Sequence, residues 1–268
     1  MENKLILSLY VKKLEGLDLN IVFDIINLYG NSNIDGVEIN TDDLDILKKC
    51  SILCKKNKLK FMCHMPLKTL SESEVIKYLN CLNDISKTLR YNINAVFHSL
   101  NNNKNINEDI EETSSFMENV LLYVKKYKLN VTISLENLNR KKGEKRINLN
   151  LIDNILNRFE DIRFTYDIGH DLYDNKKASS LSTLQKIKLN DVHIHSVVNS
   201  KDHNIINDSS NDIDQIKLAL YNLKNINYKG PIVLEYAIDN IPGEKIEEKI
   251  INLVKSFDYF KNQIIKNI

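Results

Sequence analysis

Eight short apolar runs recur along the chain, and each is separated from the next by a longer segment with helical periodicity. The runs are rich in β-branched and aromatic residues and have the length of buried strands. They cover residues 4–10, 34–39, 60–64, 94–99, 130–136, 162–167, 191–196 and 231–236. Strands that alternate with helices imply parallel pairing through right-handed crossovers. Eight such units in 268 residues are the count and the length of an α/β barrel that closes on itself.

The segments between these runs carry apolar residues at helical spacing, as residues 110–124, 149–159 and 244–268 show. A doubly wound open sheet is the alternative, but it would usually have fewer strands and a glycine-rich phosphate loop after the first one. Here the first run is followed by VKKLEG, which contains no such loop, and no Pro/Gly/Ser-rich linker divides the chain. We therefore expect a single (β/α)8 TIM barrel domain over residues 1–268.

The overall composition excludes some partners. The formal net charge is +1, which gives no general attraction to nucleic acid or to an anionic membrane. No apolar run has the length of a membrane span, and the N-terminus does not resemble a secretory signal. The four cysteines, Cys50, Cys54, Cys63 and Cys81, form no Cys-x-x-Cys pair. Cys50 and Cys54 are four apart in a helical pattern, where we expect free buried thiols, and we expect a cytoplasmic protein.

Ionisable residues gather at the C-terminal ends of the predicted strands, where barrels of this kind carry their active sites. In strand order they are Glu38, His64, His98, Glu136, Asp167, His193 and Glu235. The alternation along VTISLE indicates that they point inward, because Ser134 and Glu136 fall on the face opposite to the apolar residues. The same phase places Glu235 with Val233.

The histidines all fall at predicted strand ends or in the loops just after them, and none falls in a predicted helix; they are His64, His98, His170, His193, His195 and His203. Carboxylates that converge in a barrel mouth repel one another unless a cation or protons neutralise them. A bound divalent metal is the simplest solution. Glu136, Asp167, His193 and Glu235 would offer three carboxylates and one imidazole, a set suited to Mn²⁺, Mg²⁺ or Co²⁺ and tolerable for Zn²⁺.

Short motifs then suggest a family. They are DGVEI (35–39), HMP (64–66), FHS (97–99), LEN (135–137), DIGH (167–170), VHIH (192–195), DH (202–203) and LE (234–235). In this order and spacing the chain resembles the xylose-isomerase-like barrel superfamily. That superfamily holds sugar isomerases and 3-epimerases, hydroxypyruvate isomerases, inosose dehydratases and the apurinic endonuclease IV group. The resemblance covers nearly the whole chain and implies that Glu136, Asp167, His193 and Glu235 are shared metal ligands.

The remaining histidines have two interpretations under this resemblance. His170 would bind substrate in an isomerase, or a further zinc ion in an endonuclease. His64 and His98 match additional zinc ligands of the endonuclease group, and histidines there also contact substrate in many isomerases. His195 replaces the lysine or asparagine that the family usually has. We interpret it as a group that contacts substrate or supports a metal ligand, with a solvated strand-end residue as the alternative.

One departure from the endonuclease pattern concerns its third metal site. The pattern has Asp-x-His after the seventh strand, but with His203 in the histidine position, Lys201 stands where the aspartate should be. Asp202 is adjacent to it. This departure counts against a complete three-metal site. The glycines expected before the next helix are replaced by NDSSND (207–212), which counts against the phosphate or loop geometry that those glycines would build.

The first hypothesis is a metal-dependent isomerase or epimerase that acts on a small sugar or sugar phosphate. Such an enzyme removes a proton next to a carbonyl while the metal stabilises the enediolate. Glu136 and Glu235 come from different sides of the mouth, so one could remove the proton and the other return it. His170 and His98 would orient hydroxyl groups, and Glu38 would contact a distal hydroxyl or stand as a solvated strand end.

The second hypothesis is a zinc phosphodiesterase that cuts DNA at abasic sites. A cluster of zinc ions would generate hydroxide and hold the phosphate oxygens, and the enzyme would need a basic surface for the DNA backbone. The dense basic run is NRKKGEKR (139–146), for which a solvated loop is the alternative. A third hypothesis, a non-catalytic member, is disfavoured by the complete set of ligands. The oligomeric state stays open, although such barrels often form homo-oligomers through surface helices.

Overall fold

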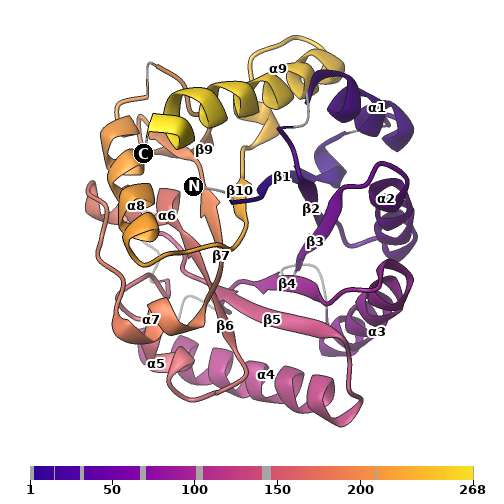
Figure 1. The fold of residues 1–268 in the computed structure, drawn as a ribbon. Helices are drawn as coiled ribbons and strands as arrows, with labels where there is room; N and C mark the ends of the chain where they lie inside the picture. The colour runs from indigo at the N-terminus through magenta and orange to yellow at the C-terminus, as the bar shows by residue number, and fades with distance from the viewer. Residues whose placement is uncertain are drawn as a thin grey trace.

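The computed structural model describes residues 3–14, 16–30, 33–66, 71–100, 105–140, 146–208 and 210–267. Parallel strands close into an eight-stranded barrel in the order β1-β10-β7-β6-β5-β4-β3-β2 (Figure 1). They are β1 (Leu5–Tyr10), β2 (Gly36–Asn40), β3 (Lys60–His64), β4 (Ile93–Phe97), β5 (Val131–Glu136), β6 (Arg163–Asp167), β7 (Leu189–Ile194) and β10 (Ile232–Leu234). A separate antiparallel pair, β8 (Ser196–Val198) and β9 (Lys201–Asn204), follows β7. The predicted TIM barrel is therefore confirmed.

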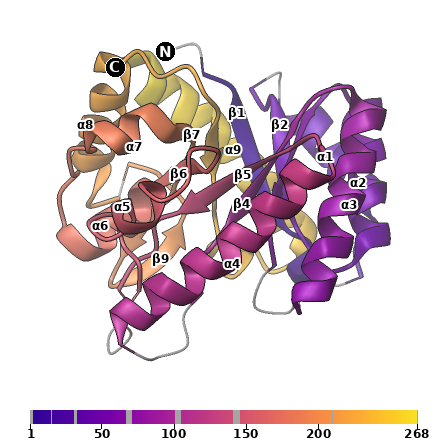
Figure 2. The same ribbon diagram turned by 90° about the horizontal axis from the view of Figure 1, so that it is seen from below.

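Helices connect the strands and cover the outside of the barrel (Figures 1 and 2). They are α1 (Leu19–Tyr29), α2 (Leu44–Lys56), α3 (Glu72–Leu89), α4 (Ile106–Lys126), α5 (Asp153–Leu156), α6 (Ile168–Asn175), α7 (Thr183–Lys188), α8 (Ile213–Asn225) and α9 (Ile246–Tyr259). Several begin at a side chain that accepts backbone N–H groups, such as Asp18 in α1, Asp43 in α2 and Asn105 in α4. The last long helix, α9, packs beside α1 (Figure 1).

The two faces of the strands build different interiors. Val131, Ile133 and Leu135 of β5 belong to the large apolar core between the strands and the helices. On the other face, Oγ1 of Thr165 lies 2.7 Å from Oγ of Ser134, within hydrogen-bond distance. This confirms the alternation predicted for VTISLE. The apolar residues of the barrel interior form a small cluster of their own, which consists of Ile6, Met62 and Val233.

The segment after the fifth strand differs from its prediction. Apolar spacing over residues 149–159 predicts a helix, but only Asp153–Leu156 forms α5. Just before it, the carbonyl oxygen of Asn148 accepts from the N–H groups of both Leu151 and Ile152. Ile152 is nevertheless buried. Successive tight turns present apolar residues to the core at nearly helical spacing, so the pattern cannot distinguish them from a helix.

Two residues of interest lie just beyond the strands expected to contain them. β7 ends at Ile194, so His195 falls outside it, and β10 ends one residue before Glu235. The N–H of Glu235 still donates to the carbonyl oxygen of Ile194 at 3.1 Å. This hydrogen bond keeps Glu235 in line with its strand at the barrel mouth.

Two expectations from composition can also be compared with the structure. Cys50 and Cys54 are free and buried, as predicted, and Cys63 and Cys81 are free and buried as well. Over the described ranges, no helix combines the length and the apolar character that a membrane crossing would require.

Candidate metal centre

The four residues predicted as metal ligands meet at the C-terminal end of the barrel. Glu136 closes β5, Asp167 closes β6, His193 lies in β7 and Glu235 follows β10. One potential ligand atom from each lies within 4.8 Å of the others. The first three side chains have no exposed surface, and the side chain of Glu235 is 18% exposed. We refer to these four residues as the quartet.

Two carboxylate oxygens of the quartet are buried and have no hydrogen-bond partner among the residues that the structure describes. They are Oε1 of Glu136 and Oδ2 of Asp167. A buried carboxylate oxygen without a partner is costly, and a cation among these atoms would provide one. Three carboxylates and one imidazole suit Mn²⁺, Mg²⁺ or Co²⁺, and Zn²⁺ tolerates them. The residues present therefore fit a divalent metal.

Glu136 directs its two oxygens at different imidazoles. Oε2 lies 2.9 Å from Nε2 of His98 and 3.3 Å from Nε2 of His64, whereas Oε1 lies 3.6 Å from Nδ1 of His193. Burial raises the pKa of Glu136, but its interactions with the imidazoles of His98, His193 and His64 outweigh it. The pKa of this carboxyl is therefore well below its usual range, and the group is ionised at neutral pH.

His64, His98 and Glu136 form a first flanking group beside the quartet. The two rings meet edge to face, with their centroids 4.6 Å apart. Burial lowers the pKa of His64, but the hydrogen bond and the charge of Glu136 outweigh it and raise this pKa to about 9. Burial lowers the pKa of His98, against the opposing charge of Glu136. At neutral pH the group thus holds one charged ring and one neutral ring against the same oxygen.

Asp167 also starts a helix. Its Oδ1 accepts the N–H of His170 at 2.7 Å and so caps α6. Asn137 holds the backbone of Asp167 from the neighbouring strand end, because its side chain accepts the N–H of Asp167 at 2.8 Å and donates to its carbonyl oxygen at 3.0 Å. Burial raises the pKa of Asp167, but His170 and His195 outweigh it and lower this pKa. Asn137 was given no role from sequence, although it directly follows Glu136.

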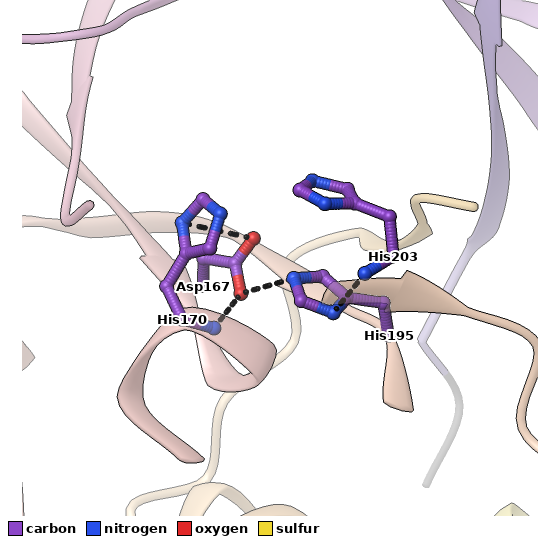
Figure 3. A group of neighbouring side chains, drawn as sticks. All are labelled: Asp167, His170, His195 and His203. Carbon is purple, nitrogen blue, oxygen red and sulfur yellow. Dashed lines mark hydrogen bonds and ion pairs between the residues drawn. The ribbon is translucent and has the colours of Figure 1, made fainter. Parts of the chain in front are cut away.

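A second flanking group joins Asp167 to His170, His195 and His203 (Figure 3). Nδ1 of His170 lies 2.9 Å from the carbonyl oxygen of Asn137, so this nitrogen is the donor, and in the neutral ring Nε2 has the lone pair. The rings of His195 and His203 stack with their centroids 4.2 Å apart. Nε2 of His170 is therefore available to a metal or a substrate.

The backbone fixes the protonation of His195. The N–H of His203 donates to Nδ1 of His195 at 2.9 Å, so the proton of the neutral ring is on Nε2, which lies 3.3 Å from Oδ1 of Asp167. Gly169 makes room for this ring, since a Cβ at that position would come within 2.2 Å of it. His195 is fully buried, so its alternative interpretation as a solvated strand-end residue is wrong. Its contact with substrate stays a prediction.

His203 lies between two carboxylates. Its Nδ1 is 3.5 Å from Oδ1 of Asp202, and its Nε2 is 3.7 Å from Oε1 of Glu235. Burial lowers the pKa of His203, but Asp202 and Glu235 outweigh it and hold this pKa well above its usual value. At neutral pH this ring is therefore charged while no metal is bound.

His193 contacts carboxylates on both sides of its ring. Nδ1 lies 2.9 Å from Oε2 of Glu235, while Nε2 lies 3.2 Å from Oε2 of Glu38 and 3.5 Å from Oδ2 of Asp191. Burial lowers the pKa of His193, but Glu38 and Glu136 outweigh it and raise this pKa well above its usual value. Glu38 lies in the middle of β2 and is fully buried, so its interpretation as a solvated strand end is wrong. Asp191 is not among the residues predicted from the sequence, although it precedes His193 by two residues and shares its face.

Two further predictions differ from the structure, and a third concerns residues that lie largely outside the described ranges. His170 lies in the first turn of α6 and His203 in β9, whereas both were expected in loops. α6 begins directly after β6, because Asp167 caps it and leaves no room for a loop. The basic run 139–146 lies largely outside the described residues, since 141–145 are not among them. Within it, the guanidinium of Arg140 lies 3.2 Å from Oδ2 of Asp174.

Comparison with known proteins follows this geometry. A family model described as a xylose isomerase-like TIM barrel matches residues 19–257, while no curated protein matches the chain. A D-tagatose 3-epimerase-like protein is 18% identical, with a TM-score of 0.69 over 98% of this chain and 99% of that one. The D-allulose 3-epimerase of Methylomonas sp. is 14% identical, with a TM-score of 0.70 over 98% and 97%.

A third similar structure bears a different name. It is an AP endonuclease, family 2, from Brucella melitensis, 16% identical, with a TM-score of 0.62 over 92% of this chain and 96% of that one. At such identities the three structures establish the fold alone. The match to the family model spans most of the sequence, and the chain therefore belongs to the xylose isomerase-like TIM barrel family.

Proposed function

We propose that the chain is a divalent-metal-dependent isomerase or epimerase of a small sugar or sugar phosphate. The observation that carries this proposal is the arrangement of Glu136 and Glu235 around His193. Each glutamate turns one oxygen toward Nδ1 of His193, at 3.6 Å and 2.9 Å. Each turns its other oxygen toward different histidines: Glu136 toward the first flanking group, and Glu235 toward His203. One oxygen of each residue would thus serve the metal and leave the other for substrate.

A divalent ion in the quartet would hold the carbonyl oxygen and the adjacent hydroxyl of the sugar and would stabilise the negative charge that develops there. Oε2 of Glu136 would remove the proton from the carbon next to the carbonyl. Glu235 is ionised, because His193 and His203 hold its pKa well below the usual value. It would return a proton that it receives from the charged ring of His203, whose Nε2 lies 3.7 Å from Oε1 of Glu235. β5 and β10 are separated in the barrel by β6 and β7, so the two glutamates approach from different directions. Return to the same carbon from the opposite face gives epimerisation, and return to the neighbouring carbon gives isomerisation.

The flanking histidines would orient the substrate. His98 is 31% exposed and neutral at neutral pH. Its Nε2 faces Glu136, so its Nδ1 can accept a hydrogen bond from a sugar hydroxyl. His170 offers the free lone pair of Nε2. The names of two similar structures, both sugar 3-epimerases or like them, support this choice of reaction.

Phosphodiester hydrolysis at abasic DNA is a second candidate. The observation that favours it is that the flanking groups share Glu136 and Asp167 with the quartet, as linked metal sites would. Hydroxide generated at such a centre would attack a phosphodiester. The second flanking group argues against it, because Nε2 of His195 carries a proton. In addition, Oδ2 of the adjacent Asp202 accepts from Asn139 at 2.7 Å.

The two candidates can be separated with one preparation. Metal-free protein would be reloaded with Mn²⁺, Co²⁺ or Zn²⁺, its metal content measured by mass spectrometry, and two activities assayed. These are deuterium incorporation from solvent into a panel of ketoses and their phosphates, and nicking of an abasic duplex. Metal in the quartet alone, with deuterium incorporation and no nicking, supports the proposal. Zinc in the quartet and both flanking groups, with nicking, would replace it by the second candidate. Deuterium incorporation that survives metal removal would contradict both mechanisms.

A further inference from the structure

Two carboxylates on the inner side of His193 have no role in the chemistry proposed above. Glu38 from β2 and Asp191 from β7 are fully buried. Oε2 of Glu38 and Oδ2 of Asp191 both face Nε2 of His193, at 3.2 Å and 3.5 Å. In the part of the chain that the structure describes, none of these three atoms has a hydrogen-bond partner of good geometry. Three buried polar atoms thus depend on one another.

The other oxygen of each carboxylate is anchored by hydroxyl groups. Ser8 Oγ donates to Oε1 of Glu38 at 3.1 Å. Thr165 Oγ1 donates to Oδ1 of Asp191 at 2.8 Å, and Ser134 Oγ lies 3.3 Å from the same oxygen. Neighbouring strands supply these anchors, since Ser8 is paired with Glu38 and Thr165 with Asp191 in the barrel register. The barrel therefore holds one oxygen of each carboxylate against the ring.

We infer that Glu38 and Asp191 are positioning residues that hold a proton on Nε2 of His193 and thereby present the lone pair of Nδ1 to a metal in the quartet. An imidazole that donates its second N–H to a carboxylate is fixed in ring orientation and tautomer and becomes a stronger metal ligand. The inference rests on the metal-binding part of the proposed function. It does not depend on which substrate is used.

The same atoms could instead hold an ion of their own. Glu38, Asp191 and His193 offer ligand atoms within 4.8 Å of one another. Ions on both sides of the ring would require His193 to lose both of its protons, whereas one proton on Nε2 satisfies the carboxylates without that cost. The number of bound ions therefore distinguishes a positioning pair from a ligand pair.

The test measures metal affinity rather than turnover. Wild type and the variants Glu38→Gln and Asp191→Asn would be stripped of metal and titrated with Zn²⁺ in competition with a chromophoric chelator. Each variant is expected to bind Zn²⁺ about 10–100-fold more weakly, with the same number of ions per chain. Unchanged affinity in both variants would overturn the inference. Loss of a whole ion relative to wild type would show that the carboxylates are ligands, and this too would overturn it.

A spectroscopic readout separates positioning from a general loss of structure. In Zn²⁺-loaded protein labelled with ¹⁵N-histidine, His193 is expected to show an Nε2–H signal protected from exchange with solvent. The variant Glu38→Gln/Asp191→Asn should lose that protection, and Ser8→Ala, which frees only Oε1 of Glu38, should weaken it. Protection that persists in the double variant would contradict the inference. Asp109→Asn is the matched control, because it removes a buried carboxylate from α4, outside the barrel.

Failure of the inference and failure of the proposed function give different results. If Zn²⁺ binds in the quartet and the variants weaken it, but no sugar exchanges deuterium, the inference stands and the proposed reaction falls. If deuterium exchange is found and the variants bind Zn²⁺ as wild type does, the reaction stands and the inference falls. If wild type binds no ion in the quartet, both fall.

Discussion

The two flanking groups are alike in composition and different in construction. In the first, His64 and His98 both direct Nε2 at one oxygen of Glu136, and His98 is partly exposed. In the second, the backbone N–H of His203 occupies Nδ1 of the buried His195. The first group can therefore adjust to a ligand, whereas the second is built into the fold. A count of histidines near a carboxylate does not give the number of ligands, because the partner of the second nitrogen decides whether a lone pair is free.

The largest effect is expected at the residue that the first flanking group shares with the quartet. Glu136→Gln removes the charge that several imidazoles face, along with the proposed base. Metal binding in the quartet should fall to background, and turnover should drop by about 10²–10⁴-fold, as expected for the loss of a general base. Metal analysis and deuterium incorporation measure the two effects. Glu111→Gln, on the surface of α4, is the control, and an active, metal-loaded Glu136→Gln protein would refute the assignment.

The next largest effect is expected from a comparison of His193, which belongs to the quartet, with His195, which belongs to the second flanking group. His193→Ala should abolish metal binding in the quartet. His195→Ala should leave the metal in place and lower turnover, since Nδ1 of this ring accepts the N–H of His203 and the neutral ring keeps no second lone pair for an ion. Metal content per chain, measured for both variants side by side, is the readout. Equal loss of metal in both would mean that His195 is also a ligand and that the two groups are equivalent.

A smaller effect, on the unfolding free energy, is expected at Gly169, which packs against the His195 ring of the second flanking group. Gly169→Ala places a methyl group within 2.2 Å of the His195 ring, so the ring or the start of α6 must shift. Such overpacking costs about 1–3 kcal/mol of unfolding free energy, measurable by chemical denaturation. In the double variant Gly169→Ala/His195→Ala the cost of the added methyl should largely disappear. If the two substitutions were additive, the ring would not be held by this contact.

The smallest effect, counted per pH unit, is the change in unfolding free energy that His64 of the first flanking group contributes. The pKa of His64 is raised from 6.5 to about 9 by Glu136, against the effect of burial. In metal-free protein, the stability that this pairing contributes is fully present below pH 6.5 and is lost as the pH rises through about 9. The slope attributable to this residue is about 1.4 kcal/mol per pH unit. Denaturation of metal-free wild type and His64→Asn across this range should show a flatter slope in the variant.

The metal-loaded form should show the opposite trend. A metal competes with the protons that His193 holds at neutral pH, so binding releases protons and tightens as the pH rises. Calorimetric titrations in buffers of different ionisation enthalpy would count the released protons. Metal affinity that did not change with pH would contradict the raised pKa of His193.

Much of the fold and of the quartet could be predicted because both rest on simple periodicities. Alternation by two residues assigned the inward face of VTISLE, and the C-terminal strand ends placed Glu136, Asp167 and His193 together. The same rule could have found Asp191, two residues before His193. The rule that functional residues lie at strand ends does not select Asp191, because Asp191 lies deeper in the barrel, within β7.

What could not be predicted depends on contacts that leave no pattern in the sequence. The protonation of His195 follows from a backbone N–H eight residues away, and its burial depends on Gly169 in another element. The role of Asn137 as a clamp on Asp167 likewise depends on two strand ends that meet only in the closed barrel. Local spacing carries no information about such partners.

The dual position of Asp167 restricts what could replace it. Its Oδ1 receives the amide of His170 and so starts α6, while Oδ2 remains for a cation. Asparagine could start the helix but would bring no negative charge, and glutamate would bring the charge on a side chain too long to cap well. The two substitutions therefore separate local folding from ion affinity. The hydrogen-exchange rate of the His170 amide also reports the stability of the hydrogen bond between this amide and Oδ1 of Asp167, and it can be measured without any substrate.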